Sequence, residues 1–336
     1  MASEFTPLNC TKKILFIVLS YNGYEDTVEC LESLYANLPD TADVLIIDNA
    51  SFPPVVSKLQ TRFPNAEVVA LASNTGWAGG NNFGIQLALD RGFDWICLLN
   101  NDTVFPEGQV AAWCSSLIST PPALMHPSIY YWDEPEIAQL RPSDNEHGNR
   151  AVGEKDWHGH VLLQFAYGAC LGVHRTIFER IGIFDPRLFL QLEETDFYHR
   201  AVTAGYVAAC NPAVKIFHKE SRAFGGKKTP GKMYYIVRNS LLVIEKRRER
   251  AAVKLSLLRD LYWTIQHVAA ANRMQSGLVA TLRWFISDAP FATATRAGII
   301  DYLLRRFGKM PEMLSLRLAV PRDCLLEDEP EIESAR

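Results

Sequence analysis

Strands and helices alternate through the first hundred or so residues, and this alternation restricts the chain to few folds. Residues 14–20 form a continuous apolar run that ends in serine, which is typical of a strand covered on both faces. Further strands are predicted at 43–48, 67–72 and 95–99, with helices at 25–35, 56–63 and 81–91. This order predicts an α/β domain built on a mixed, mainly parallel sheet with helices on both faces.

The composition narrows the class of protein. The 336 residues suffice for one large domain or two ordinary ones, and 48% hydrophobic with 21% charged residues is typical of a soluble globular chain. The formal net charge of −4 argues against a nucleic-acid-binding protein. Seven scattered cysteines without a Cys-x-x-Cys pair favour reduced, buried thiols over zinc or disulfides.

The expected location is cytoplasmic, with peripheral contact to the inner face of the membrane. The apolar run at 14–19 lacks the cleavage pattern of a signal peptide, and no stretch approaches the roughly 18 apolar residues of a membrane span. Residues 215–259 carry 13 Lys or Arg against 3 Asp or Glu. This basic stretch is either an ordinary solvated helix face or a contact for anionic lipid headgroups.

The second half of the chain has a less regular pattern. Residues 120–157 are expected to form an irregular excursion with one short strand around 129–131. The remaining predictions are strands at 164–173, 206–209 and 214–217, and helices at 175–181, 196–204, 233–250, 254–271 and 278–306. The chain therefore ends in a helical region, and its last dozen residues are expected to be disordered.

Polar residues follow the predicted strands of the first half. They are Tyr21 and Asn22, Asp48 and Asn49, Asn74, and the run Asn100, Asn101 and Asp102. Ligands of parallel α/β sheets bind at the carboxyl ends of the strands, so this distribution predicts a binding site at that edge.

The segment from Asn74 to Gly84 reads as a loop between a strand and a helix. Its glycines permit close backbone approach, and the following helix N-terminus attracts an anion. A tight turn with an Asn cap is the alternative. The spacing does not match the dinucleotide-binding fingerprint, which disfavours a nicotinamide oxidoreductase.

Asp102 is a candidate metal ligand. A carboxylate at a strand end, flanked by carboxamides, suits a hard divalent cation that also bridges phosphate oxygens. A helix cap before Pro106 is the alternative. Asp48 is either a ligand for a base N–H or ribose hydroxyl, or the cap of a turn. His218 ends a predicted strand and is either structural or part of the site.

Three carboxylates, Glu193, Glu194 and Asp196, lie within four residues after an apolar run. Like charges held this close raise one another's pKa, an arrangement typical of reactive or cation-binding sites. A solvated first helical turn is the alternative, since acidic residues favour that position.

Taken together, these elements resemble the family 2 glycosyltransferases of the GT-A fold, especially the rhamnosyltransferase-like branch. The resemblance covers about residues 12–245 and follows the order and spacing of the motifs. The matching motifs are residues 18–22, 46–51, 74–84, 98–102, 168–170, 182–185 and 193–200.

The resemblance implies a role for each of these residues. Asp48 contacts the nucleotide base, Asp102 binds the metal that neutralises the leaving diphosphate, and His218 completes that site in some members. The implied donor-binding residues are Ser20, Tyr21, Asn22, Asp48, Asn49, Asn74, Gly79, Gly80, Asn81, Asn82, Asn100 and Asn101. Glu194 matches the catalytic base, and Glu193 and Asp196 complete the catalytic group.

The implied reaction is an inverting transfer of a sugar to a polysaccharide or lipid-linked glycan. The first choice of donor is dTDP-rhamnose, with Mg²⁺ or Mn²⁺ as cofactor. The alternative is a degenerate relative that binds nucleotide sugar or a partner without turnover. Two departures bear on this choice: Asn100 replaces the first Asp of the usual Asp-x-Asp motif, and Glu194 replaces Asp as the base.

The predicted domain organisation combines this resemblance with the helical pattern of the C-terminal part. A catalytic domain over 1–230 would comprise a nucleotide-binding half at about 12–105 and an acceptor half at about 106–230. A helical C-terminal region over 231–320 and a disordered acidic tail over 321–336 would follow. The oligomeric state stays open.

Overall fold

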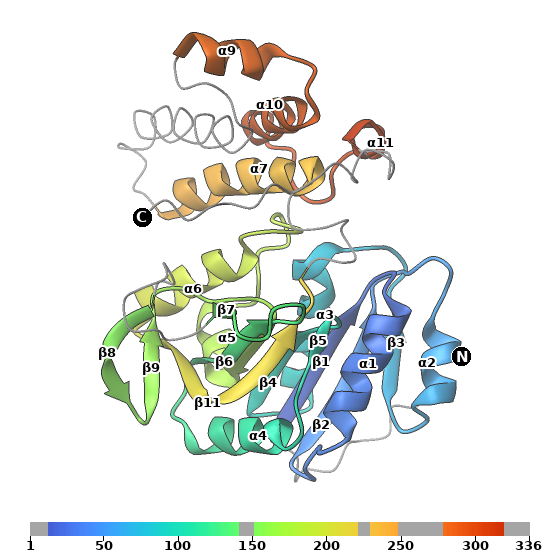
Figure 1. The fold of residues 1–336 in the computed structure, drawn as a ribbon, viewed down its shortest axis with the longest axis vertical. Helices are drawn as coiled ribbons and strands as arrows, with labels where there is room; N and C mark the ends of the chain where they lie inside the picture. Colours follow the sequence, from blue (N-terminus) through green and yellow to red (C-terminus); the bar gives the residue numbers. More distant parts are fainter. Residues whose placement is uncertain (1–12, 141–150, 221–228, 248–277, 319–336) are drawn as a thin grey trace. The chain divides into compact units, whose positions relative to one another are not determined.

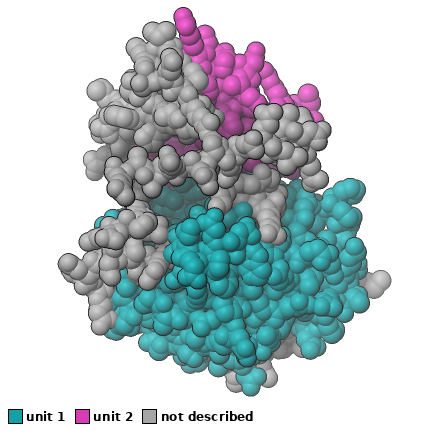
Figure 2. Space-filling view, in the orientation of Figure 1, with its two compact units in different colours: residues 1–227 teal, residues 228–336 magenta. Residues whose placement is uncertain are grey.

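The computed structural model describes residues 13–140, 151–220, 229–247 and 278–318. The chain divides into two compact units, residues 1–227 and residues 228–336 (Figure 2). The predicted helix at 254–271 and the acidic tail at 321–336 lie outside the described residues, as do parts of the basic stretch at 215–259.

A single mixed sheet of 11 strands forms the frame of the first unit (Figure 1). Its strands are β1 (Ile14–Ser20), β2 (Ala42–Asp48), β3 (Glu67–Ala70), β4 (Trp95–Asn100), β5 (Thr103–Val104), β6 (Leu124–Tyr131), β7 (Ala138–Leu140), β8 (Ala151–Trp157), β9 (His160–Leu163), β10 (Cys170–His174) and β11 (Ala208–His218). The order is β3-β2-β1-β4-β10-β6-β11-β9-β8, with β5 paired to β11 and β7 paired to β6.

The helices of the first unit pack on this sheet, and those of the second unit pack on one another. Those of the first unit are α1 (Tyr24–Tyr35), α2 (Val56–Arg62), α3 (Gly76–Asp90), α4 (Gln109–Ser119), α5 (Arg175–Ile181) and α6 (Glu193–Thr203). Those described in the second unit are α7 (Pro230–Arg247), α9 (Leu278–Ile286), α10 (Pro290–Leu303) and α11 (Glu312–Leu318). The α/β sheet and the helical C-terminal region predicted from the sequence are both confirmed.

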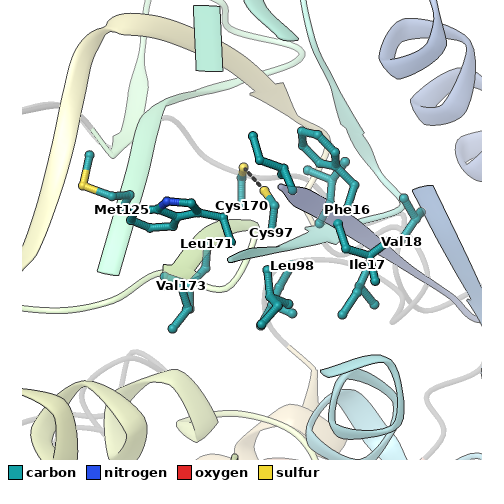
Figure 3. Packing of buried hydrophobic residues seen from close by; sticks show 14 of the residues in the cluster. Phe16, Ile17, Val18, Cys97, Leu98, Met125, Cys170, Leu171 and Val173 are labelled. Atoms are coloured by element: carbon teal, nitrogen blue, oxygen red, sulfur yellow. Dashed lines mark hydrogen bonds between the residues drawn. The ribbon is translucent and has the colours of Figure 1, made fainter. Parts of the chain in front are cut away.

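Strand β1 lies at the centre of the parallel part of the sheet, between β2 and β4. All seven of its residues are buried, as the continuous apolar run predicts. Its side chains alternate between the two faces: Phe16 and Cys97 lie on one, Ile17 and Leu98 on the other (Figure 3). Strand β10 is antiparallel to both β4 and β6, so it runs opposite to its two neighbours.

In the second unit, a glycine lets α10 cross α7 closely. A Cβ added to Gly298 would lie 2.8 Å from the carbonyl oxygen of Tyr234. Next to this crossing, Arg238 is fully buried and donates to Tyr234 Oη (3.2 Å) and to the Gly308 carbonyl (2.7 Å). None of the described helices, in either unit, combines the length and apolar character needed to cross a membrane.

The glycine-rich segment differs from its prediction. Helix α3 begins at Gly76 rather than at residue 81, so most of the expected loop is helical. The glycines serve helix packing: a Cβ on Gly80 would lie 2.4 Å from Leu19 Cδ1, and one on Gly84 would lie 2.8 Å from Ile17 Cγ2. The absent side chains let α3 approach β1 closely.

The described residues between 120 and 157 are more regular than predicted, because they include β6, β7 and β8. The strand predicted at 164–173 is correct only in its second half: residues 164–169 form no strand, and β10 begins at Cys170. By contrast, the strands predicted at 206–209 and 214–217 are one strand, β11, with an irregularity between Asn211 and Lys215. The helix predicted at 278–306 is interrupted before Pro290, whose ring cannot continue the helical hydrogen bonding.

Candidate active site

The loops after β1 and β2 are joined by side-chain hydrogen bonds. In the parallel register Ser20 lies beside Asp48, which is 2% exposed. Oδ1 of Asp48 accepts from the Ser51 backbone N–H (3.2 Å) and hydroxyl, and Ser51 Oγ accepts from the Asn22 N–H (2.9 Å). The carboxyl ends of the two strands therefore present one fixed polar edge, as their sequence predicts.

Two predicted donor-binding asparagines hold the entry to α3. Asn49 Nδ2 donates to Asn74 Oδ1 (3.3 Å) and the Gly76 carbonyl (3.0 Å), while its Oδ1 accepts from the Thr75 N–H (2.9 Å). Asn74 Oδ1 also accepts from the Gly76 N–H (2.8 Å). The carboxamides of Asn49 and Asn74 are thus engaged within the protein.

Two more asparagines lie on α3 itself. Asn81 Nδ2 donates to the Trp77 carbonyl (2.9 Å), and its buried Oδ1 has no partner among the described residues. Asn82 accepts from the Phe184 N–H (3.0 Å) and donates to the Phe184 carbonyl (2.9 Å), 102 residues away. Asn82 therefore attaches α3 to the segment that leads to the carboxylates.

The residues after β4 contact three different elements. Asn100 Oδ1 accepts from the Trp77 indole N–H (2.9 Å), and Asn101 Nδ2 donates to the Thr27 hydroxyl (2.9 Å). Asp102 Oδ1 lies 3.2 Å from His218 Nε2, and both side chains are buried. The pairing of β5 with β11 places Thr103 opposite His218 and so joins these chain-distant residues.

Gln139 on β7 completes this cluster, and the sequence analysis missed it. Its Oε1 lies 2.7 Å from His218 Nδ1 and accepts from the Tyr167 hydroxyl (3.1 Å), while its Nε2 donates to the His218 carbonyl (3.2 Å). The predicted irregular excursion contained no periodicity that would have singled out Gln139.

The three carboxylates form the first turn of α6. Leu192, which precedes the helix, has a left-handed backbone with φ of 72°. Asp196 is 2% exposed and pairs with Arg200 at 3.0 Å, whose guanidinium also donates to the Ile181 and Ile183 carbonyls. Asp196 thereby fixes the start of the helix to the segment before it.

Glu193 and Glu194 influence each other's pKa. Burial, followed by the charge of Glu194, raises the pKa of Glu193 well above its usual range. Burial also raises the pKa of Glu194 to about 7, although a hydrogen bond from Glu193 works in the opposite direction. A carboxyl that titrates near neutrality is suited to accept a proton during a reaction.

Tyr167 connects the carboxylate pair to the Asp102 cluster. Its pKa is raised, first by burial and then by nearby groups that include Glu194 and Asp102. The charges on α6 and after β4 therefore act on one phenol. Across the described residues, no group of three or more His, Cys, Asp or Glu side chains is arranged to hold a metal ion. Asp102 and His218 form a pair.

The described part of the basic stretch contains buried cations. The Lys219 side chain is 4% exposed, and its Nζ pairs with Asp26 at 2.6 Å and with Glu29. Lys232 is 8% exposed. These lysines therefore do not form an open basic face, and membrane contact through residues 215–259 stays a prediction.

A family model and two curated relatives all relate the chain to glycosyltransferases. The model of Glycosyl transferase family 2 matches residues 15–182. A hexosyltransferase of low-salt glycan biosynthesis, Agl10 of Haloferax volcanii, is 25% identical over 55% of the chain and 60% of its own length. The N-acetylglucosaminyl-diphospho-decaprenol L-rhamnosyltransferase of Mycobacterium tuberculosis is 23% identical over 62% of the chain and 76% of its own.

One solved structure extends this likeness to most of the chain. The mannosyltransferase PcManGT of Pyrobaculum calidifontis, in complex with GDP-Man and Mn²⁺, has a TM-score of 0.54 at 18% identity. The match covers 89% of this chain and 88% of that one. At this identity the likeness concerns the fold alone, and it confirms the predicted GT-A architecture.

Proposed function

Because the chain belongs to glycosyl transferase family 2, we propose that it transfers a sugar from a nucleotide-diphosphate donor to a hydroxyl of a glycan or lipid-linked acceptor. The family match over residues 15–182 confirms the glycosyltransferase expected from the sequence. The observation that carries the finer proposal is the position of Tyr167. Its hydroxyl donates to Gln139 Oε1 (3.1 Å) beside His218, and burial together with nearby charges that include Glu194 and Asp102 raises its pKa. One site would then contain a proton acceptor and a metal-ligand pair.

Asp102 and His218 fit a divalent cation. Their Oδ1 and Nε2 atoms lie 3.2 Å apart, and both side chains are buried at the end of the sheet. A carboxylate with an imidazole suits Mn²⁺ better than Mg²⁺, because Mg²⁺ strongly prefers oxygen ligands. When bound, the cation would supply positive charge for the diphosphate that leaves.

Glu194 is the proposed base. It takes the proton of the acceptor hydroxyl while the oxygen forms a bond to the anomeric carbon of the donor sugar. The bond from that carbon to the diphosphate oxygen breaks, and the nucleoside diphosphate keeps the electron pair. A single displacement of this kind inverts the anomeric configuration, by the same logic that applies to inverting glycosidases.

The proposed donor is dTDP-rhamnose. The resemblance to the rhamnosyltransferase-like branch supports it, as does the similarity to the mycobacterial L-rhamnosyltransferase. Asp48 would accept from the base N–H through the oxygen that Ser51 does not engage. The Asn22–Ser51 contact would hold both strand-end loops ready for the nucleotide.

A transfer assay on the full chain tests the proposal. The protein would be incubated with Mn²⁺, a lipid-diphosphate-linked N-acetylglucosamine acceptor, and dTDP-rhamnose, UDP-sugars or GDP-sugars in parallel. We expect dTDP release that depends on the acceptor, and a product with inverted anomeric configuration by NMR. Nucleotide-sugar binding without turnover of any donor would favour the degenerate alternative.

A further inference from the structure

We propose that Gln139 is a positioning residue that fixes the tautomer of His218, so that Nε2 presents its lone pair beside Asp102 and the two side chains form a cation site. This inference rests on the proposed function for the presence of the cation. The residue role itself follows from hydrogen-bond geometry within the first unit.

The orientation of the Gln139 carboxamide is determined by its neighbours. The His218 carbonyl oxygen can only accept, so the group 3.2 Å from it must be the amide nitrogen Nε2. The carbonyl oxygen Oε1 then faces His218 Nδ1 at 2.7 Å and the Tyr167 hydroxyl at 3.1 Å. A flipped carboxamide would place two acceptors against each other at the His218 carbonyl.

This orientation decides which imidazole nitrogen carries the proton. Because Oε1 only accepts, Nδ1 must donate to it. In the neutral ring Nε2 is therefore unprotonated, and its lone pair is directed at the region of Asp102 Oδ1, 3.2 Å away. A divalent cation that binds both Nε2 and Oδ1 takes the position that a proton would occupy between them.

The backbone holds Gln139 in place for this role. Strand β7 pairs with β6, and β6 pairs with β11 in a register that puts Tyr131 beside His218. The Trp132 N–H also donates to the His218 carbonyl (3.2 Å). Residues that orient a metal-ligating histidine through its second nitrogen typically contribute a factor of about 10–100 to metal affinity or activity.

Binding of Mn²⁺ alone to the full chain, followed by the electron paramagnetic resonance of free Mn²⁺, tests the role without transfer activity. We expect Gln139→Leu, which removes the acceptor at Nδ1, to weaken binding by about 10–100-fold. In a His218→Ala background, Gln139→Leu should cause no further loss, because Gln139 acts through the imidazole.

Gln109→Leu is the matched control. Gln109 Oε1 accepts from the Lys215 N–H (2.8 Å), three residues before His218 on the same strand. Its substitution should leave Mn²⁺ affinity within about twofold, well below the factor expected at a residue that orients a ligand. Wild-type affinity in Gln139→Leu, or an undiminished effect without His218, would overturn the proposal.

The tautomer itself gives a readout that needs no variant at Gln139. Long-range ¹H–¹⁵N correlation spectra distinguish Nδ1–H from Nε2–H rings, and the His218 signal is identified by its loss in His218→Ala. We expect Nδ1–H in the neutral ring, and Nε2–H would contradict the assignment.

Sugar transfer by a protein with an Nε2–H ring would refute this inference alone. An Nδ1–H ring and Mn²⁺ binding without sugar transfer would refute the proposed function alone.

Discussion

His218 Nε2 lies 3.2 Å from Asp102 Oδ1, in a contact created by the pairing of β5 with β11. If this pair binds the cation, Asp102→Asn removes the charged ligand and should lower the Mn²⁺-dependent transfer rate by about 100-fold or more, since metal stabilisation of the leaving group is worth several kcal/mol. Initial rates over a range of Mn²⁺ concentrations measure the effect. The same substitution at the exposed Asp40 is the control. If the transfer rate depended on the Mn²⁺ concentration in the same way in both variants, Asp102 would be excluded as a ligand.

Replacement of Glu194 by glutamine tests the proposed base. The carboxamide cannot accept the proton of the acceptor hydroxyl, so kcat should fall by about 10²–10⁴-fold. The affinity for dTDP should stay unchanged, because the proposed base acts on the acceptor and not on the nucleotide. Steady-state kinetics and calorimetry separate these quantities, with Glu107→Gln on the exposed surface as control. Full activity in Glu194→Gln with metal bound would show that another group takes the proton.

The pH profile depends on the same carboxyl. Because burial raises the pKa of Glu194 to about 7, kcat/KM should rise with pH through the region near 7. Two hydrogen bonds lower this pKa, one from the backbone at Glu194 and a smaller one from the Glu193 side chain. Glu193→Ala should therefore shift the rising limb to higher pH, and Glu193→Gln, which keeps a donor, should shift it less. A rise of kcat/KM at the ordinary carboxyl pKa would contradict the assignment of Glu194 as the base.

The buried Glu193 also makes the free energy of unfolding depend on pH. Its folded-state pKa is raised, so ionisation at higher pH opposes the folded state. The stability contributed by the neutral form is complete below the ordinary carboxyl pKa and is lost as the pH rises through the raised pKa. Glu193→Gln cannot ionise, and we expect it to melt above the wild type at pH 8 but not at pH 4. Calorimetry at both pH values measures the difference, and a constant difference would contradict the ionisation argument.

The sequence predicted the parts of this site that local patterns encode. The apolar run of β1 and the polar residues after β2 and β4 mark strands and their ends directly, so the edge with Asp48 and Asp102 was predictable. Gln139 was not, because its role depends on the pairing of the three-residue strand β7 with β6. The start of α3 was misplaced because Gly80 was interpreted as a loop residue. Gly80 is instead a helix residue that allows close packing against Leu19, a tertiary contact that the local sequence does not reveal.

Substitution of Asn82 tests whether this residue stabilises the fold or binds the donor. Its carboxamide satisfies both backbone groups of Phe184 in a buried setting, so Asn82→Ala leaves two buried polar groups without their partner. Each unsatisfied group costs about 1–3 kcal/mol, so the free energy of unfolding should fall by at least about 2 kcal/mol. Urea denaturation measures this loss, and Asn65→Ala on the exposed surface is the control. Asn82→Asp keeps the acceptor for the Phe184 N–H and should lose less. Unchanged stability together with weaker dTDP binding would instead assign Asn82 to the donor.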